Sequence, residues 1–296
     1  MIAPRSHAIV RACIAILISG AAGAWAGDVA GLPAAEETAK QRLNASPRHG
    51  EYAKVDVRGT PVRTWVVYPE RKERAPVVIV IHEIFGLTDW IRAVADQLAA
   101  DGFIAVAPDL LSGKGPGGGG TDAFASRDDA VKAVSALPRD EVLARLDAVR
   151  TWALALPAAA PRSATIGFCW GGGTSFAYAV AQPTLDAAVV YYGTSPDPAT
   201  LESVKAPVLG LYGGNDARVN ATIEPTKAKM KELRKSYEPH VFDGAGHGFL
   251  RAQDGADGAN LKAAKEAWPL TIAFLRRDRT RQRVHGSAPP SSESGR

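Results

Sequence analysis

The stretch that decides the fold is ATIGFCWGGG, residues 164–173, in which a short apolar strand turns sharply and a helix begins. Its centre is Gly-x-Cys-x-Gly, with Cys169 between Gly167 and Gly171. A tight strand-to-helix turn strains its central residue, and small residues on either side let strand and helix approach closely. The N–H groups that open the helix favour negative charge there. A lone cysteine is most often an inert buried residue, but this pattern predicts a nucleophile at Cys169.

Strand and helix patterns alternate along the chain on both sides of this turn. Residues 53–58 and 62–68 predict an antiparallel hairpin at a sheet edge, and the β-branched run 77–81 predicts a central strand buried on both faces. Further strands are expected at 103–107, 164–168, 187–192, 207–212 and 237–242, and helices at 88–100, 128–136, 140–156, from 172, 222–236 and 259–275. This alternation predicts an α/β fold with a mostly parallel central sheet flanked by helices, in which ligands bind at the carboxyl ends of the strands.

Both ends of the chain are expected to lie outside this domain. The first 26 residues have a basic start, an apolar run over 12–24 and a small-x-small site that ends at Ala26, which predicts a cleaved secretory signal peptide. The apolar run is short for a membrane span, so we expect a periplasmic or secreted protein without stable membrane insertion; an uncleaved anchor is the alternative. The predicted segments are a signal peptide at 1–26, an N-terminal extension at 27–50, the α/β domain at 51–275 and a disordered, arginine-rich tail at 276–296.

Charge and cysteine content narrow the possible functions. The formal net charge of +4 comes from the arginines of the two ends, so the α/β domain has no basic stripe and no nucleic-acid partner is expected. Of the two cysteines, Cys13 lies in the predicted signal peptide, which leaves Cys169 alone in the mature chain and excludes an internal disulfide. A single thiol in an oxidising compartment is exposed to oxidation, and we expect such a residue to be kept for its chemistry.

Two further residues follow later strands of the predicted sheet. Asp216 comes after the strand at 207–212, in GGND, and His247 after the strand at 237–242, in GHGF. A thiol with an ordinary pKa of about 8.5 is mostly protonated at neutral pH; His247 can act as its base, and Asp216 can fix the tautomer of the imidazole. The chain order Cys, Asp, His is that of an α/β-hydrolase fold. Either residue alone could be an ordinary loop side chain, but together with the thiol they predict a catalytic triad.

The loop after the strand at 77–81 supplies the remaining parts of the predicted site. In α/β-hydrolases this loop and the residue after the nucleophile donate the N–H groups of the oxyanion hole, which predicts Ile84 and Trp170 as donors. Glu83 comes just before Ile84, in HEIFG. A carboxylate there repels an oxyanion unless it is protonated or paired with a cation. Glu83 is therefore either a functional acid or a solvent-facing loop residue.

Four motifs, HEIFG, GFCWGG, GGND and GHGF, in this order and spacing, resemble those of the dienelactone hydrolase family over residues 55–275. The resemblance implies a triad of Cys169, Asp216 and His247 on an α/β-hydrolase fold. It also implies that Glu83 binds the thiol proton in the resting enzyme and lets the thiolate form when substrate arrives.

The same resemblance implies two arginines that bind a substrate carboxylate, a task for which guanidinium groups are suited. One matches Arg251, four residues after the triad histidine. The other matches Arg127, which stands where a helix begins, and this match depends on the register across the glycine-rich loop 113–120. The alternative for Arg251 is an ion pair with a nearby acid such as Asp254.

No metal-ligand spacing and no cofactor motif stand out, so no metal and no organic cofactor are expected. We therefore expect a monomeric, cysteine-dependent hydrolase that acts through an acyl-enzyme on small esters or lactones that carry a carboxylate. The alternative is a non-hydrolytic thiol protein, with a redox or ligand-binding role on the same fold. The predicted Asp216, His247 and oxyanion donors favour hydrolysis, since a redox thiol needs none of them.

Overall fold

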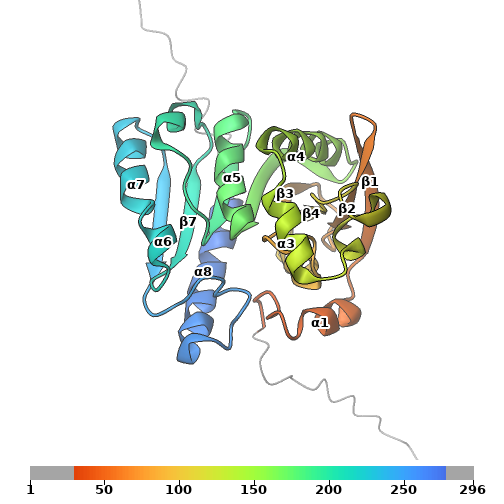
Figure 1. Ribbon diagram of the computed structural model, residues 1–296, viewed down its shortest axis with the longest axis horizontal. Helices are drawn as coiled ribbons and strands as arrows, with labels where there is room; N and C mark the ends of the chain where they lie inside the picture. Colours follow the sequence, from red (N-terminus) through yellow and green to blue (C-terminus); the bar gives the residue numbers. More distant parts are fainter. Residues whose placement is uncertain (1–29, 278–296) are drawn as a thin grey trace, which may run out of the picture.

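One sheet of eight strands runs through the computed structural model, which describes residues 30–277 of the 296-residue chain (Figure 1). The strands are β1 (Gly50–Val57), β2 (Thr60–Val67), β3 (Ala75–Ile81), β4 (Ile104–Pro108), β5 (Ala159–Phe168), β6 (Ala187–Tyr191), β7 (Val208–Gly213) and β8 (Tyr237–Phe242), in the spatial order β1-β2-β4-β3-β5-β6-β7-β8. β2 is antiparallel to β1 and β4, and the other neighbouring pairs are parallel. The predicted α/β fold, with its mostly parallel sheet and edge hairpin, is confirmed. The predicted signal peptide, 1–26, and residues 278–296 of the predicted tail lie outside the described residues.

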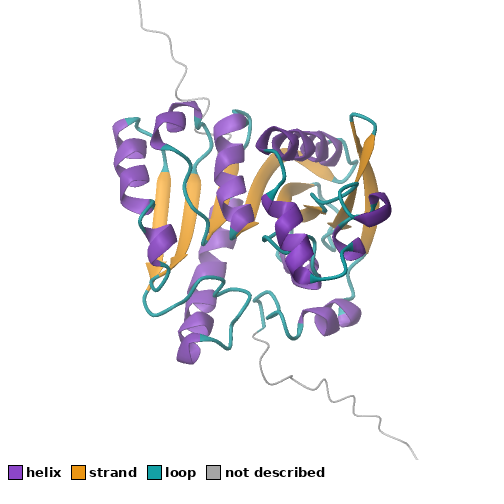
Figure 2. Cartoon of the chain, viewed as in Figure 1, coloured by secondary structure: helices purple, strands orange, loops and turns teal. Residues whose placement is uncertain are grey.

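Helices cover both faces of this sheet (Figure 2). They are α1 (Ala39–Ala45), α2 (Asp89–Ala100), α3 (Arg127–Ser135), α4 (Arg139–Leu154), α5 (Trp170–Ala181), α6 (Ala217–Asn220), α7 (Ile223–Glu232) and α8 (Ala259–Arg276). Buried residues of α1, α2 and α8 share one core with one face of the sheet, and those of α4, α5 and α7 share a second core with the other face. Within residues 30–277, none of the helices combines the length and the apolar character that a bilayer span requires.

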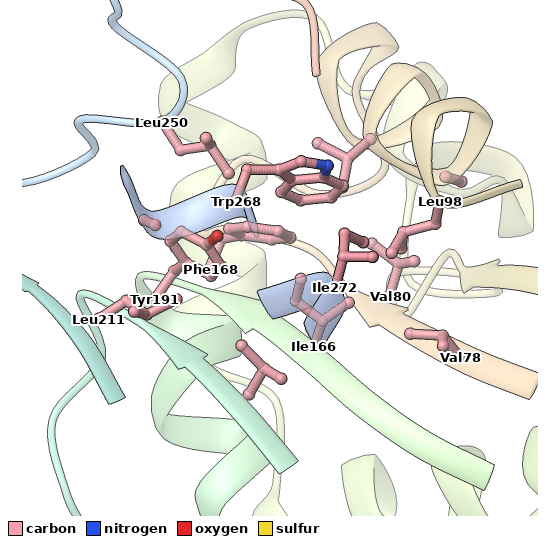
Figure 3. Packing of buried hydrophobic residues seen from close by; sticks show 14 of the residues in the cluster. Val78, Val80, Leu98, Ile166, Phe168, Tyr191, Leu211, Leu250, Trp268 and Ile272 are labelled. Atoms are coloured by element: carbon pink, nitrogen blue, oxygen red, sulfur yellow. The ribbon is translucent and has the colours of Figure 1, made fainter. Parts of the chain in front are cut away.

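The central strand β3 shows why a continuous β-branched run belongs in the middle of such a sheet. Val78 and Val80 face α2 and α8, in the core that Figure 3 shows. Val77, Ile79 and Ile81 point to the opposite face and pack in the core under α4 and α5. All five side chains are buried, and each buried aliphatic side chain stabilises the fold by about 1.5–3 kcal/mol relative to exposure. Burial on both faces therefore fixes this strand, and with it the loop at its carboxyl end.

The turn between β5 and α5 has the strained geometry that the sequence predicts. Cys169 has a φ of 55° and a ψ of −117°, a conformation that residues with a side chain rarely adopt. A methyl group on Gly167 would lie 1.9 Å from the carbonyl oxygen of Gly171, and one on Gly171 would lie 2.3 Å from the carbonyl oxygens of Ile81 and His82. The absence of a side chain at both glycines thus lets α5 begin directly against β5 and against the end of β3.

The described part of the N-terminal extension is packed into the domain, which the sequence patterns do not indicate. Leu32 and Ala34 are buried in the same core as α2 and α8. Trp90 of α2 donates from Nε1 to the carbonyl oxygen of Ala34 at 3.0 Å, and Gln253 donates from Nε2 to the carbonyl oxygen of Pro33 at 2.9 Å. The extension is therefore held between α2 and the loop that follows β8.

Candidate active site

Four loops at the carboxyl edge of the sheet carry the predicted catalytic residues. Glu83 follows β3, Cys169 follows β5, Asp216 follows β7 and His247 follows β8. Parallel strands end at the same edge of a sheet, which is where open α/β sheets bind their ligands. The fold therefore brings together residues that are far apart in the sequence.

Asp216 and His247 form a direct pair. His247 Nδ1 lies 2.5 Å from Asp216 Oδ2, and the carboxylate is buried while the imidazole is partly exposed. Asp216 also accepts from the N–H of Val219 at 3.4 Å, as the residue that caps α6. A carboxylate at Nδ1 holds the tautomer that keeps the proton there. The Nε2 atom is then free to accept a proton, as a general base must be.

The thiol of Cys169 lies among the groups expected of an oxyanion hole. Burial raises the pKa of this thiol, and the negative charge of Glu83 raises it further. The backbone N–H groups of Trp170 and Ile84 lie near the sulfur and act in the opposite direction, lowering its pKa. The structure thus places both predicted donors near the sulfur of Cys169, and the net upward shift of its pKa favours the protonated thiol.

Glu83 is a buried acid beside an arginine. Its side chain is buried, and burial raises its pKa to about 7, against the lowering effect of Arg251. Arg251 Nε lies 2.9 Å from Glu83 Oε2, an ion pair whose N–H is not aimed at the oxygen. The interpretation of Glu83 as a solvent-facing loop acid does not hold, because the carboxyl group is inside the site. At neutral pH it exchanges readily between its protonated and ionised forms.

His82 supports the loop that carries Glu83, a role that no sequence motif indicated. Its ring is fully buried, and burial lowers its pKa, which favours the neutral imidazole. Nε2 accepts from the N–H of Leu110 at 3.3 Å, so Nδ1 carries the proton and donates to the carbonyl oxygen of Glu83 at 2.6 Å. The ring also stacks on Trp170, with 5.6 Å between ring centroids. His82 therefore connects the two segments that supply the oxyanion donors.

The predicted substrate-binding arginines lie together beside Glu83. Arg251 and Arg127 both stack on Phe85, at 5.4 Å and 3.6 Å from its ring centroid. Arg251 pairs with Glu36 and with Glu83, and Arg127 Nη1 lies 3.1 Å from Glu36 Oε1. The alternative partner of Arg251, a nearby acid in its own loop, is not the one found. The carboxylate between the two guanidinium groups comes instead from the N-terminal extension.

Tyr192 is a further site residue that the sequence analysis did not identify. It directly follows β6 with a φ of 37°, and its ring packs edge-on against His247 with 5.2 Å between centroids. Its hydroxyl is buried without a hydrogen-bond partner among the described residues. Burial raises the pKa of this phenol well above its ordinary value, and the charge of Glu83 raises it further. A protonated, unpartnered hydroxyl can donate to a ligand, and its place at a strand end was the available signal.

Two cavities border these residues. One of about 340 Å³ lies beside the start of α5, and one of about 270 Å³ lies beside Phe85. The first is lined by Leu137, Arg139, Val142, Leu143, Trp170, Gly173, Thr174, Ala177, Thr194, Ser195 and Pro196, and the second by Glu36, Phe85, Thr88, Thr121, Phe124, Ala125, Ser126, Arg127 and Ala130. Both volumes suit small acyl or alcohol groups. In the part of the chain described, no three His, Cys, Asp or Glu side chains are grouped so as to hold a metal ion.

A mostly parallel eight-stranded sheet, an elbow between strand and helix, and an Asp–His pair at the carboxyl edge define an α/β-hydrolase. A model of the dienelactone hydrolase family matches residues 62–278. The chain belongs to the dienelactone hydrolase family, and this membership makes it an enzyme, a hydrolase of ester or lactone bonds.

Individual relatives agree with this placement. A Salmonella typhimurium protein assigned as a carboxymethylenebutenolidase is 34% identical over 230 residues, which are 73% of this chain and 83% of the relative. A Saccharolobus solfataricus protein with the same assignment is 29% identical over 252 residues, 75% of this chain and 96% of the relative. A crystal structure from Klebsiella pneumoniae, described as a dienelactone hydrolase, is 29% identical with a TM-score of 0.68 and covers 78% of this chain and 99% of its own.

Proposed function

We propose that this protein hydrolyses small esters or lactones through the thiolate of Cys169 and a thioester acyl-enzyme. The observation that carries the proposal is the thiol at the strained elbow between β5 and α5, where the backbone N–H groups of Trp170 and Ile84 lower its pKa. When the sulfur attacks an ester, the carbonyl oxygen of the substrate becomes negative. The same two N–H groups can then bind this oxygen as an oxyanion hole. The pair of His247 and Asp216, at the same carboxyl edge of the sheet, supplies the base and its orienting acid in this proposal.

The proposed reaction has two halves. In the first, His247 Nε2 takes the thiol proton while the sulfur of Cys169 attacks the carbonyl carbon. The tetrahedral intermediate collapses, the C–O bond to the alcohol breaks, and the imidazolium gives its proton to the leaving alkoxide. In the second half, His247 takes a proton from water, the hydroxide attacks the thioester, and the C–S bond breaks. The proton returns from the imidazolium to the sulfur, which restores the resting thiol.

We propose that Glu83 keeps the resting thiol protonated. The two side chains are close enough for the charge of Glu83 to raise the pKa of Cys169, and Glu83 itself has a pKa of about 7. A protonated thiol oxidises and alkylates slowly, because the thiolate is the reactive form. This arrangement supports the export that residues 1–26 predict, since a lone thiol then survives in a periplasmic or extracellular setting.

The substitution Glu83→Gln is expected to make Cys169 more reactive. Loss of the negative charge lowers the pKa of the thiol, and each pKa unit raises the thiolate fraction about tenfold. The rate of alkylation by iodoacetamide at pH 7 should therefore rise several-fold to tenfold. Glu37→Gln is the matched control, because Glu37 is an exposed residue of the N-terminal extension. This variant should be alkylated at the same rate as the wild type. An unchanged alkylation rate in Glu83→Gln would contradict the proposal that Glu83 keeps the thiol protonated.

The same substitution should change how stability depends on pH. The pKa of Glu83 is raised from its ordinary value near 4.5 to about 7 in the folded state, so its contribution to the free energy of unfolding is fully present below pH 4.5. That contribution is lost as the pH rises from 4.5 to 7. Over this range the carboxyl group ionises in the unfolded state but stays largely protonated in the folded state, which favours unfolding. Urea denaturation of the wild type should show the free energy of unfolding falling over this range relative to Glu83→Gln.

The two arginines affect which substrate charge the site prefers. Their position beside Glu83 supports the match to the family arginines that bind a substrate carboxylate. Both guanidinium groups are already paired with Glu36, however. We therefore propose small esters and lactones as the substrate class, with the preferred charge of the acyl group set by Glu36.

The proposed function is tested with p-nitrophenyl butyrate and the mature protein. We expect a burst of p-nitrophenol stoichiometric with enzyme, followed by slower turnover if deacylation limits the rate, and a quenched sample should carry a butyryl group on the tryptic peptide that contains Cys169. If the protein is instead a redox or ligand-binding thiol protein, p-nitrophenol should not be released above the uncatalysed rate and no peptide should be labelled. A label on any other residue would also refute the assigned nucleophile.

A further inference from the structure

Glu36, from the N-terminal extension, occupies the space between the two site arginines. Its Oε2 pairs with Arg251 Nη1 and its Oε1 lies 3.1 Å from Arg127 Nη1. One carboxylate therefore bridges two guanidinium groups, which is the binding mode by which such a pair would hold the carboxylate of a ligand. Glu36 also lines the cavity of about 270 Å³ together with Phe85 and Arg127.

The backbone around Glu36 is packed against the domain, which holds the start of this side chain beside the arginines. The N–H of Glu36 donates to the carbonyl oxygen of Arg251 at 3.0 Å. On one side Ala34 and Ala35 are buried, and on the other Ala39 is fully buried at the start of α1. The ion pair is partly buried too, with 30% of the Glu36 side chain and 20% of the Arg251 side chain exposed. Displacing the carboxylate would therefore break its ion pairs with both arginines.

The balance of charge argues against a second carboxylate at the same place. Arg251 and Arg127 bring two positive charges, and Glu36 with ionised Glu83 brings two negative charges. A carboxylate on the substrate would add a third negative charge beside a nearly neutral cluster. It would also meet the carboxylate of Glu36 itself, which lines this cavity and would repel a second carboxylate at short range. An uncharged acyl group meets neither obstacle.

We infer that Glu36 is a specificity-determining residue, an internal carboxylate that fills the arginine pair and restricts the enzyme to esters and lactones with an uncharged acyl group. This inference rests on the proposed function and changes the substrate expected from the arginines alone. The N-terminal extension then sets which substrates the site accepts, while the catalytic residues come from the sheet.

Two esters of similar length and shape test the inference. p-Nitrophenyl butyrate has an uncharged acyl group, and mono-p-nitrophenyl succinate replaces its terminal methyl group with a carboxylate. The wild type should favour the butyrate in kcat/KM. Glu36→Gln should raise the ratio of kcat/KM for the succinate over that for the butyrate about 10- to 100-fold, the range expected when a charge-assisted pair with the arginines becomes available. Glu36→Ala should act in the same direction.

Glu37→Gln is the matched control, since Glu37 is the exposed neighbour of Glu36 on the same segment. It should leave the ratio unchanged, and thermal unfolding should show that all the variants are folded. An unchanged ratio in folded Glu36→Gln and Glu36→Ala, or a wild type that favours the succinate, would overturn the inference.

A second measurement separates this inference from the proposed function. If the wild type releases p-nitrophenol from neither ester, the proposed function fails. Calorimetric titration with succinate then tests Glu36 alone, because binding needs no catalysis. Succinate should bind Glu36→Gln at least tenfold more tightly than the wild type, and equal affinity for the two proteins would overturn the role of Glu36.

Discussion

Replacing Cys169 with alanine is expected to lower kcat for p-nitrophenyl butyrate by a factor of roughly one thousand or more. The substitution removes the atom that forms the acyl-enzyme in the proposed mechanism, so only binding and the proposed N–H donors of Ile84 and Trp170 would remain to act on the ester. Alanine also has to adopt the φ of 55° at this position, but cysteine already bears that strain, so the fold should persist. Steady-state release of p-nitrophenol by the purified variant measures the effect.

Two control measurements test whether the loss of activity comes from the missing thiol and not from unfolding. The melting temperature and near-ultraviolet circular dichroism of Cys169→Ala should match those of the wild type, since the small side chain contributes little to the core. Iodoacetamide should no longer label the protein at residue 169. A folded variant that kept ordinary esterase activity would show that another residue is the nucleophile.

Most of the fold was predictable because its signals are local and redundant. The run at 77–81 is β-branched without interruption because β3 is buried on both faces. The elbow was predictable for a steric reason, since a side chain at Gly167 or Gly171 would overlap backbone atoms. Helix and strand bounds shifted by a few residues, as expected where the ends of elements are set by packing rather than by sequence.

The positions of the candidate catalytic residues were predictable because each of them follows a strand. The carboxyl edge of a parallel sheet collects such residues whatever their separation in sequence, and this rule joins Asp216 to His247 at 2.5 Å. The same rule applies to Tyr192, which ends the strand predicted at 187–192 and directly follows β6 in the structure, although nothing in the sequence showed that its hydroxyl is buried without a partner among the described residues.

Glu36 was beyond sequence reasoning. It stands in a short polar and alanine-rich segment with no periodic pattern, and 215 residues separate it from Arg251. Its position depends on tertiary contacts, namely the hydrogen bonds from Trp90 and Gln253 to the backbone of the extension. A motif can show which arginines are present, whereas only the fold shows which acid pairs with them.

Asp216→Asn is expected to lower kcat by roughly one hundredfold or more while leaving the structure intact. Asparagine keeps the shape of the side chain and can still accept from the N–H of Val219 at the start of α6. Its amide can, however, present N–H to His247 Nδ1, which moves the imidazole proton to Nε2 and leaves no base for the thiol. It also removes the negative charge that stabilises the imidazolium. The loss should be smaller than for a serine nucleophile, because a thiol needs less help to ionise.

The matched control for this change is Asp243→Asn, which removes an exposed carboxylate from the loop after β8. It alters the net charge equally and should leave kcat for p-nitrophenyl butyrate within a factor of two. The burst separates the steps further, since the wrong tautomer slows acylation and should abolish the burst in Asp216→Asn. Equal effects of the two substitutions, or a burst of normal rate in Asp216→Asn, would show that the pair of Asp216 and His247 holds the loops together without acting on the thiol.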